Sequence, residues 1–135
     1  MESLAARHSV TLTDMNLKNT LFALSNILDA AEGSSRLTAL DLESRAILRL
    51  VGTSTSAGHE VCIKDITTKL QPYGSAVTLV KRIQGLCHSG WLVQGTSQLH
   101  HRRVTLRLSA KAQREFNAMS AQIEAEWAQF VRQQG

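Results

Sequence analysis

The amino-acid sequence predicts a mainly α-helical (α+β) fold, in which long helices near both ends flank short helices and a β-hairpin. Three observations lead to this prediction. Apolar residues recur every three or four positions over 12–34 and over 110–134, which is the spacing of one helix face. Over 38–109, short apolar runs alternate with turns rich in Gly, Pro and Ser. The 135 residues, 43% of them hydrophobic, suffice for the core of a single domain.

The first long helix is predicted over 13–32, with Thr13 and Asp14 as caps and leucines at helical spacing along one face. A Gly-Ser-Ser stretch ends it. A second helix is predicted over 41–51, because apolar residues again recur at helical spacing. We expect Gly52 to end this helix, since glycine is common just beyond a helix C-terminus.

The middle of the chain alternates turns with short elements. A loop rich in Ser and Thr over 53–58 precedes a short β-run over 61–63. A brief helix is predicted over 65–70, which cannot continue into the following Gln-Pro. The turn 72–74 then leads into a longer helix over 75–89.

The last third of the chain has the pattern of a hairpin followed by a helix. Strands are predicted over 91–93 and 104–108, separated by a polar loop over 95–101. A long helix then runs over 109–133. Two short helices joined by a tight turn and followed by a hairpin with a basic tip form a winged helix-turn-helix.

Positive charge is concentrated in the same region. The net charge of the chain is only +4, but between 64 and 114 nine basic residues stand against the single acid Asp65, which gives +8. The two flanks together hold six basic and ten acidic residues, which gives −4. A basic segment between acidic ends is typical of a protein that binds a polyanion.

The helix 75–89 carries polar residues suited to the major groove of DNA, which is about 12 Å wide. A helical wheel places Ala76, Val80, Ile83 and Cys87 on its apolar side and Ser75, Thr78, Arg82, Gly85 and Ser89 on the opposite side, with Lys81 beside them. Its candidate DNA contacts are Ser75, Thr78, Lys81 and Arg82. The alternative is an ordinary solvated helix face.

The hairpin tip, or wing, over 95–103 supplies the other candidate DNA contacts: His100, His101, Arg102 and Arg103. A hairpin turn requires Gly, Asn or Asp rather than arginines. Arginine side chains do fit a narrow minor groove. We therefore expect the wing to contact the minor groove or the DNA backbone.

Two stretches carry a family resemblance. The run 101–112, His-Arg-Arg-Val-Thr-Leu-Arg-Leu-Ser-Ala-Lys-Ala, and the Leu-Cys-His-Ser-Gly-Trp-Leu-Val run over 86–93 resemble the wing and the end of the recognition helix in the MarR (multiple-antibiotic-resistance regulator) family and its staphylococcal accessory-regulator relatives. His101 stands where that family has an aspartate, and Ala112 where it has a glycine.

The resemblance implies a homodimer whose end helices, 12–34 and 110–134, form the interface. It also implies a pseudo-palindromic double-stranded DNA operator and a small aromatic effector. Apolar residues of the two end helices independently favour a dimer, because one winged domain of 38–109 cannot cover them all.

The resulting prediction is a dimeric, sequence-specific transcriptional regulator, most simply a repressor. The alternative is a winged-helix module for protein–protein contact, such as an adaptor or anti-activator. We do not expect an enzyme or a cofactor, because the sequence has no Gly-rich phosphate loop, nucleophile elbow or paired catalytic carboxylates.

Cysteine content and hydropathy complete the prediction. Cys62 and Cys87 have no metal-ligand or disulfide-framework spacing, so reduced, largely buried thiols are expected, with redox sensing as the alternative. No signal peptide and no apolar run near the roughly 20 residues of a membrane span is present, so the expected location is cytoplasmic.

Overall fold

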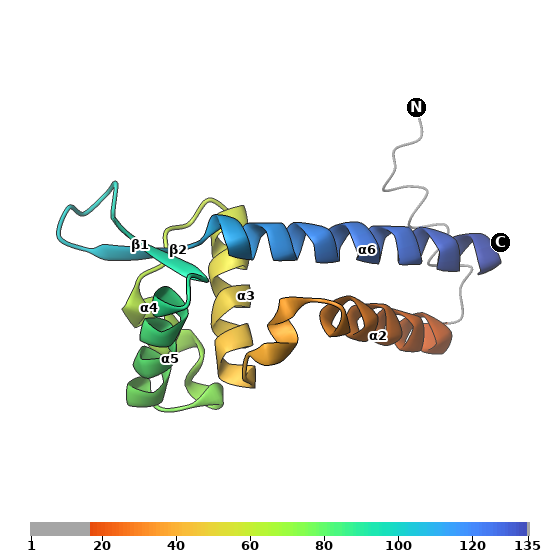
Figure 1. The fold of residues 1–135 in the computed structure, drawn as a ribbon, viewed down its shortest axis with the longest axis horizontal. Helices are drawn as coiled ribbons and strands as arrows, with labels where there is room; N and C mark the ends of the chain where they lie inside the picture. Colours follow the sequence, from red (N-terminus) through yellow and green to blue (C-terminus); the bar gives the residue numbers. More distant parts are fainter. Residues whose placement is uncertain (1–16, 135) are drawn as a thin grey trace. The chain divides into compact units, whose positions relative to one another are not determined.

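The computed structural model describes residues 17–134 and confirms the mainly α-helical fold with one small antiparallel sheet. Two compact units are present. The winged unit is Leu37–Phe116, and the terminal unit joins the described residues up to Arg36 with those from Asn117 to Gln134. In chain order the elements are α2 (Leu17–Gly33), η1 (Arg36–Ala39), α3 (Leu42–Ser56), α4 (Ile63–Lys69), η2 (Gln71–Tyr73), α5 (Ala76–His88), β1 (Leu92–Thr96), β2 (Val104–Leu108) and α6 (Ala110–Gln134) (Figure 1).

Helix α3 is longer than the sequence predicts. Asp41, the predicted start of this helix, is its N-cap, since its carboxylate accepts the backbone N–H of Ser44 at 2.9 Å. The predicted end at Gly52 is wrong, because the helix continues to Ser56. Glycine inside a helix costs only about 1 kcal/mol, and a Cβ built at Gly52 would lie 3.3 Å from Leu108 Cδ1. Gly52 therefore allows α3 to pack closely against β2.

Helix α4 starts two residues before its predicted beginning. The backbone N–H of Cys62 and its Sγ–H both donate to Asp65 Oδ2, at 3.0 and 3.1 Å, which fixes the first turn. The predicted β-run over 61–63 shrinks to one bridge, in which Leu106 N donates to the carbonyl of Val61 at 2.8 Å. Cys62 and the residue after it belong to the start of α4.

Helix α5 is one residue shorter at each end than the predicted 75–89, because Ser75 is its N-cap and Ser89 its C-cap. Gly90 closes it with φ of 84°, a left-handed conformation that glycine adopts readily. The buried face is rotated from the predicted one: Leu79, Ile83 and Leu86 are its buried residues. These side chains are larger than those of Ala76 and Cys87 and occupy the core in their place.

The β1–β2 hairpin forms an antiparallel ladder from Leu92↔Leu108 to Thr96↔Val104. β1 extends three residues beyond the predicted strand, so the connecting loop is Ser97–Arg103. Leu92 and Leu106 are buried. In Figure 1 the hairpin projects from the side of α3, beyond the α4–α5 pair.

The core of the winged unit consists of apolar side chains from η1, α3, α4, α5, both strands, the first turn of α6 and the segments between them. Its buried members are Leu37, Ile47, Leu48, Val51, Val61, Cys62, Ile66, Leu70, Leu79, Ile83, Leu86, Trp91, Leu92, Leu106 and Ala112. This one contiguous core fixes the positions of α5 and the hairpin.

In the terminal unit, α2 buries Ile27 and Ala31 but leaves other large apolar residues exposed. Ser34 Oγ donates to Gln122 Oε1 on α6 at 2.9 Å. The rings of Trp127 and Phe130 stack at 5.3 Å between centroids. The predicted caps Thr13 and Asp14 lie outside the described residues. Within 17–134, no helix is both long and apolar enough for a membrane span.

Candidate nucleic-acid interface

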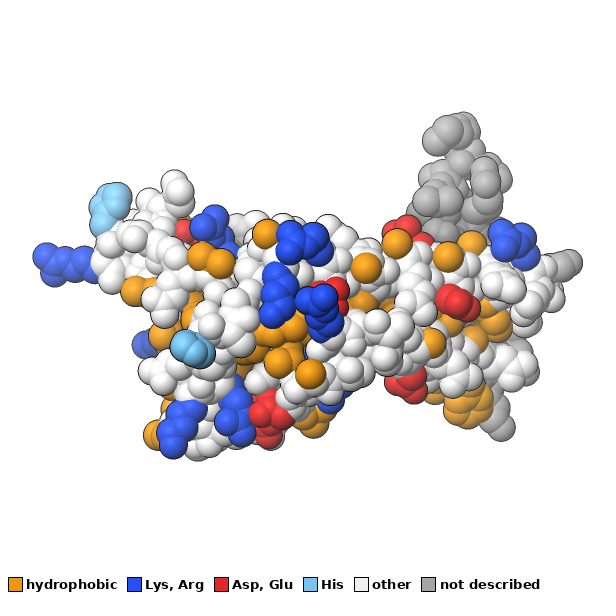
Figure 2. Space-filling model, viewed as in Figure 1, with side chains coloured by type: hydrophobic (Ala, Val, Ile, Leu, Met, Phe, Trp, Pro, Cys, Tyr) orange, Lys and Arg blue, Asp and Glu red, His pale blue; other side chains and the backbone are white. Residues whose placement is uncertain are grey.

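The exposed face of α5 is opposite its buried leucine and isoleucine side chains. Val77, with 67% of its surface exposed, Lys81, Gln84 and His88 lie along this face. Their spacing of four, three and four residues keeps them in one stripe. Figure 2 shows Lys and Arg side chains over the α4–α5 pair and at the end of the hairpin.

The hydroxyl groups predicted to contact DNA at the start of α5 are bonded to each other. Ser75 Oγ accepts the backbone N–H of Thr78 at 3.2 Å and donates to Thr78 Oγ1 at 3.1 Å. The first of these bonds is the N-cap that satisfies one of the helix's free amides. Both side chains therefore lie on the flank of α5, beside the exposed stripe.

Arg82 lies on the same flank and points toward α3. Its Nε is 2.7 Å from Asp41 Oδ2, and both side chains are 42% exposed. The approach is off the N–H direction, so the contact is an ion pair rather than a well-directed hydrogen bond. Asp41 thus caps α3 and neutralises Arg82 at once.

The wing loop is held to the body of the winged unit by Glu60. Ser97 Oγ–H donates to Glu60 Oε1 at 2.6 Å, and the backbone N–H of Gln98 donates to Oε2 at 2.9 Å. The same Ser97 oxygen accepts the backbone N–H groups of Leu99 at 3.1 Å and His100 at 2.9 Å. Ser97 is only 2% exposed, so the base of the loop is ordered by four hydrogen bonds around one buried hydroxyl and one carboxylate.

These bonds change the acidity of Glu60. The hydrogen bond from Ser97 lowers the pKa of this carboxyl most, followed by the one from Gln98, with smaller contributions from the charges of His100 and Arg103. The pKa of Asp65 is also lowered, first by the backbone N–H of Cys62, with Arg103 among the later contributors. Glu60 is therefore ionised and bound at neutral pH, and Arg103 lies within the field of two acids.

The tip of the wing, beyond the hydrogen bonds of Glu60 and Ser97, is exposed. His100, His101, Arg102 and Arg103 all have exposed side chains. The backbone of Arg103 is bonded on both sides, to the carbonyl of His100 and to the amide of Ser97, each at 2.9 Å. Arg102 is next to it at the turn of the loop.

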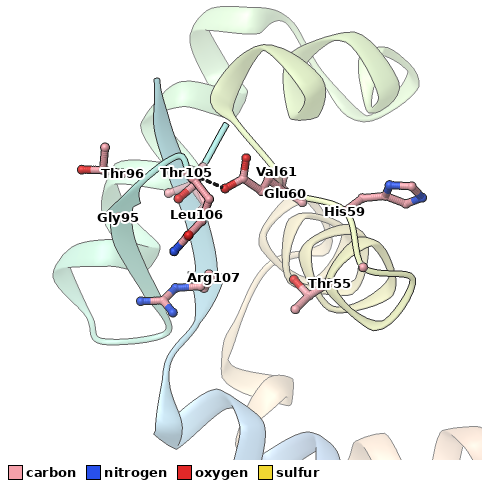
Figure 3. Close-up of a pocket in the computed structure, with 11 residues that line it drawn as sticks. Thr55, His59, Glu60, Val61, Gly95, Thr96, Thr105, Leu106 and Arg107 are labelled. Atoms are coloured by element: carbon pink, nitrogen blue, oxygen red, sulfur yellow. Dashed lines mark hydrogen bonds between the residues drawn. The ribbon is translucent and has the colours of Figure 1, made fainter. Parts of the chain in front are cut away.

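A cavity of about 350 Å³ lies between the hairpin and the segment that follows α3. Thr105 and Arg107 line it from the strands, and Thr55 and His59 from the other side (Figure 3). Its one acidic lining residue is Glu60, whose carboxylate is already bonded to the wing. The cavity therefore adjoins the contact that orders the loop.

Lys111, one of the nine basic residues of the central segment, has a structural contact. Its Nζ donates to the carbonyl of Ser89 at 3.2 Å and lies 4.5 Å from the centroid of the Trp91 ring. It thus bonds a free carbonyl at the end of α5 and makes a cation–π contact. Ser109 N–H also donates to the carbonyl of Trp91 at 3.0 Å.

Sequence reasoning missed the exposed residues Val77, Gln84 and His88, and it missed Glu60 and Ser97. The spacing of Leu79, Ile83 and Leu86 is the signal that could have identified the first three. These side chains form the buried face of α5, and the missed residues lie on the opposite face. The 37 positions between Glu60 and Ser97 leave no local pattern that pairs them.

Comparison with solved structures finds the same fold in transcriptional regulators. The transcriptional regulator Tm0710 from Thermotoga maritima superposes with a TM-score of 0.66 at 13% identity, over 88% of this chain and 78% of that one. MepR of S. aureus bound to ethidium bromide gives 0.66 at 13% identity, over 90% and 84%. A single-residue variant of MepR bound to an oligodeoxyribonucleotide gives 0.62 at 14%, over 87% and 80%.

These proteins are MarR-family regulators, so the resemblance predicted from the sequence is confirmed at the level of the fold. No protein-family model matches the sequence, and no curated protein matches it either.

Proposed function

We propose that this chain is a dimeric, sequence-specific DNA-binding transcriptional regulator. In this proposal α5 enters the major groove and the wing, 95–103, contacts the minor groove or the backbone. The observation that carries it is the wing itself: an exposed cationic tip on a loop whose base is ordered by Glu60 and Ser97. The MepR variant with the same fold is bound to an oligodeoxyribonucleotide, which supports the assignment of DNA as the partner.

The eight predicted contact residues divide between the two elements. Lys81 is exposed on the outer stripe of α5, whereas Ser75, Thr78 and Arg82 lie on its flank, where phosphates of the groove wall approach. On the wing, His100, His101, Arg102 and Arg103 provide the cationic tip.

The dimer is supported by apolar surface on the terminal unit. Leu21, Phe22 and Leu28 on α2 are 61%, 54% and 47% exposed. Several large apolar side chains exposed on one helix favour burial against a second copy. Two copies would present two α5 helices to half-sites about one DNA turn, or 34–36 Å, apart, hence a pseudo-palindromic operator.

Light scattering on the purified chain tests the dimer. The wild type should have twice the chain mass, and Phe22→Lys should lower that mass toward one chain. A wild type that stays monomeric at micromolar concentration would contradict the dimeric part of the proposal.

The test of DNA binding is a duplex-binding titration at several salt concentrations. Affinity should fall steeply with salt, because cations of the wing and α5 release counterions from the phosphates. A regulator that represses by blocking a promoter should also reduce transcription from a template carrying its selected site. Absence of duplex binding even at low salt would overturn the proposal and favour the winged-helix protein-contact module.

A small aromatic effector is the further part of the proposal. MepR is solved with ethidium bromide, an aromatic cation, and its fold is shared by this chain. An effector that acts on this protein should lower its affinity for duplex DNA in proportion to its own binding. Ethidium itself is unsuitable as a probe because it binds DNA, so a panel of non-intercalating phenolic and aromatic compounds should be used.

A further inference from the structure

We infer that sequence recognition by α5 depends on Val77 and Gln84, with Lys81 between them as a further DNA contact, and that Val77 and Gln84 select a half-site containing a thymine and an adenine. This inference rests on the proposed function and names the bases which that function would read. It assigns Thr78 and Arg82, two of the DNA contacts predicted from the sequence, to the flank of the helix rather than to the bases.

The rotation of α5 about its own axis determines which side chains face away from the core. Leu79, Ile83 and Leu86 are buried, so the direction pointing into the core of the winged unit is fixed. With about 100° of rotation per residue, the side chains most nearly opposite are those of Val77, Lys81, Gln84 and His88. All four are exposed. A helix that lies in the groove must present this stripe to the base edges.

Thr78 and Arg82 are turned away from that direction and have partners within the chain. Thr78 Oγ1 accepts a hydrogen bond from Ser75 at 3.1 Å, within the cap of the helix. Arg82 pairs with Asp41 on α3 at 2.7 Å. Moving the Arg82 guanidinium to a base would break this ion pair and leave Asp41 facing the phosphates without its counter-charge.

The length of the stripe matches a short run of bases. From Val77 to Gln84 the helix rises seven residues, or about 10 Å. That distance equals about three base pairs along the DNA axis at roughly 3.4 Å each. Three side chains on three successive steps are therefore in reach of neighbouring bases.

The chemical groups of each side chain indicate which base it would contact. The exposed methyl groups of Val77 match the C5-methyl group of thymine, the apolar feature of the major groove. The Gln84 amide can bond adenine N6 and N7 together, and Lys81 can donate to guanine N7 and O6 or to a phosphate.

Two further features favour close approach of DNA to this face. The sequence of α5 contains no acidic residue, so nothing on the helix repels phosphates. Gly85 lies next to Gln84 and Lys81 around the helix, and a Cβ built there would have no atom within 4 Å. The helix backbone at Gly85 is therefore open to the groove.

The experiment selects bound sequences from a pool of random duplex DNA with the wild type and four variants. Val77→Ala should lose the preference for thymine at one position of each half-site, and Gln84→Ala the preference for adenine at another. Each loss should be about tenfold in discrimination, which corresponds to 1.4 kcal/mol. Thr78→Ala and Arg82→Ala are the matched controls on the flank, and should keep the wild-type motif while binding more weakly overall.

The outcomes separate this inference from the proposed function. A wild type that selects no sequence would overturn the proposed sequence-specific function, and this assignment with it. A wild-type motif that Val77→Ala and Gln84→Ala leave unchanged would overturn the assignment alone. The assignment alone would also be overturned if Thr78→Ala or Arg82→Ala lost the preference for a base at any position of the half-site. Circular dichroism of each variant checks that the fold is retained, as expected for exposed positions.

Discussion

The carboxylate of Glu60 and the hydroxyl of Ser97 meet at 2.6 Å across 37 positions of the chain, and this contact orders the wing. The hydroxyl also accepts two backbone N–H groups of the loop, so its removal leaves both amides without their acceptor. The wing of this chain is therefore held from outside the hairpin, by a residue between α3 and α4.

Glu60→Ala and Ser97→Ala should each weaken duplex binding several-fold, because an unordered loop loses more conformational entropy on binding. The double variant should bind about as tightly as the weaker single variant, since both changes remove the same contact. Fluorescence anisotropy with a labelled duplex measures the affinities. Independent, additive losses would contradict a shared contact.

The wing should also loosen in acid. The pKa of Glu60 is below its ordinary value of 4.5, so its hydrogen bonds contribute fully above about that pH and are lost as the pH falls through the lowered value. The amides of Leu99 and His100 should keep constant hydrogen-exchange protection factors near neutral pH and lose protection only below 4.5. In Glu60→Gln this pH dependence should disappear. Loss of protection already near pH 6 would point to a histidine instead.

Arg102 and Arg103 should differ in what they contribute. Arg102→Ala should reduce the slope of log affinity against log salt by about 1, because one phosphate contact is lost, and leave the melting temperature unchanged. Arg103 lies in the field of Glu60 and Asp65. Arg103→Ala should therefore raise the pKa values of both acids as well as weaken DNA binding. Carboxyl titrations by NMR distinguish the two variants.

Two glycines should respond to substitution in opposite ways. Gly85→Ala should stabilise the free protein by roughly 0.5–1 kcal/mol, because alanine is the better helix former and the site is open. The added methyl group should also weaken DNA binding. Gly52→Val should destabilise by about 1–3 kcal/mol, since a Cβ there already approaches Leu108 at 3.3 Å. Urea unfolding of both variants measures these changes, and equal stability of the two would contradict the packing argument.

Local patterns predicted most of the fold. The ends of α5 and the start of α3 were predicted to within one residue, because the capping and turn chemistry at Asp41, Ser75 and Ser89 acts between near neighbours in the sequence. The end of α3 was placed too early, since the packing of Gly52 against β2 is a tertiary contact.

The candidate site was predicted less completely than the fold. The wing cations could be recognised from composition at a hairpin tip. The exposed face of α5 could not be recognised, because Ala76, Val80 and Cys87 form a competing apolar stripe, and only packing within the winged unit selects Leu79 and Leu86 for the core. Contacts such as Arg82 with Asp41 need the three-dimensional arrangement.

The contacts of Lys111 have a mechanical consequence. Through the carbonyl of Ser89 and the ring of Trp91, the last turn of α5 is joined to the first turn of α6 at 3.2 and 4.5 Å. A tilt of that first turn strains both contacts unless α5 moves with it, and the 13 residues of α5 span about 20 Å. Over that length, a rotation of about 10° corresponds to a displacement of roughly 3 Å at the far end of α5, where Val77 lies.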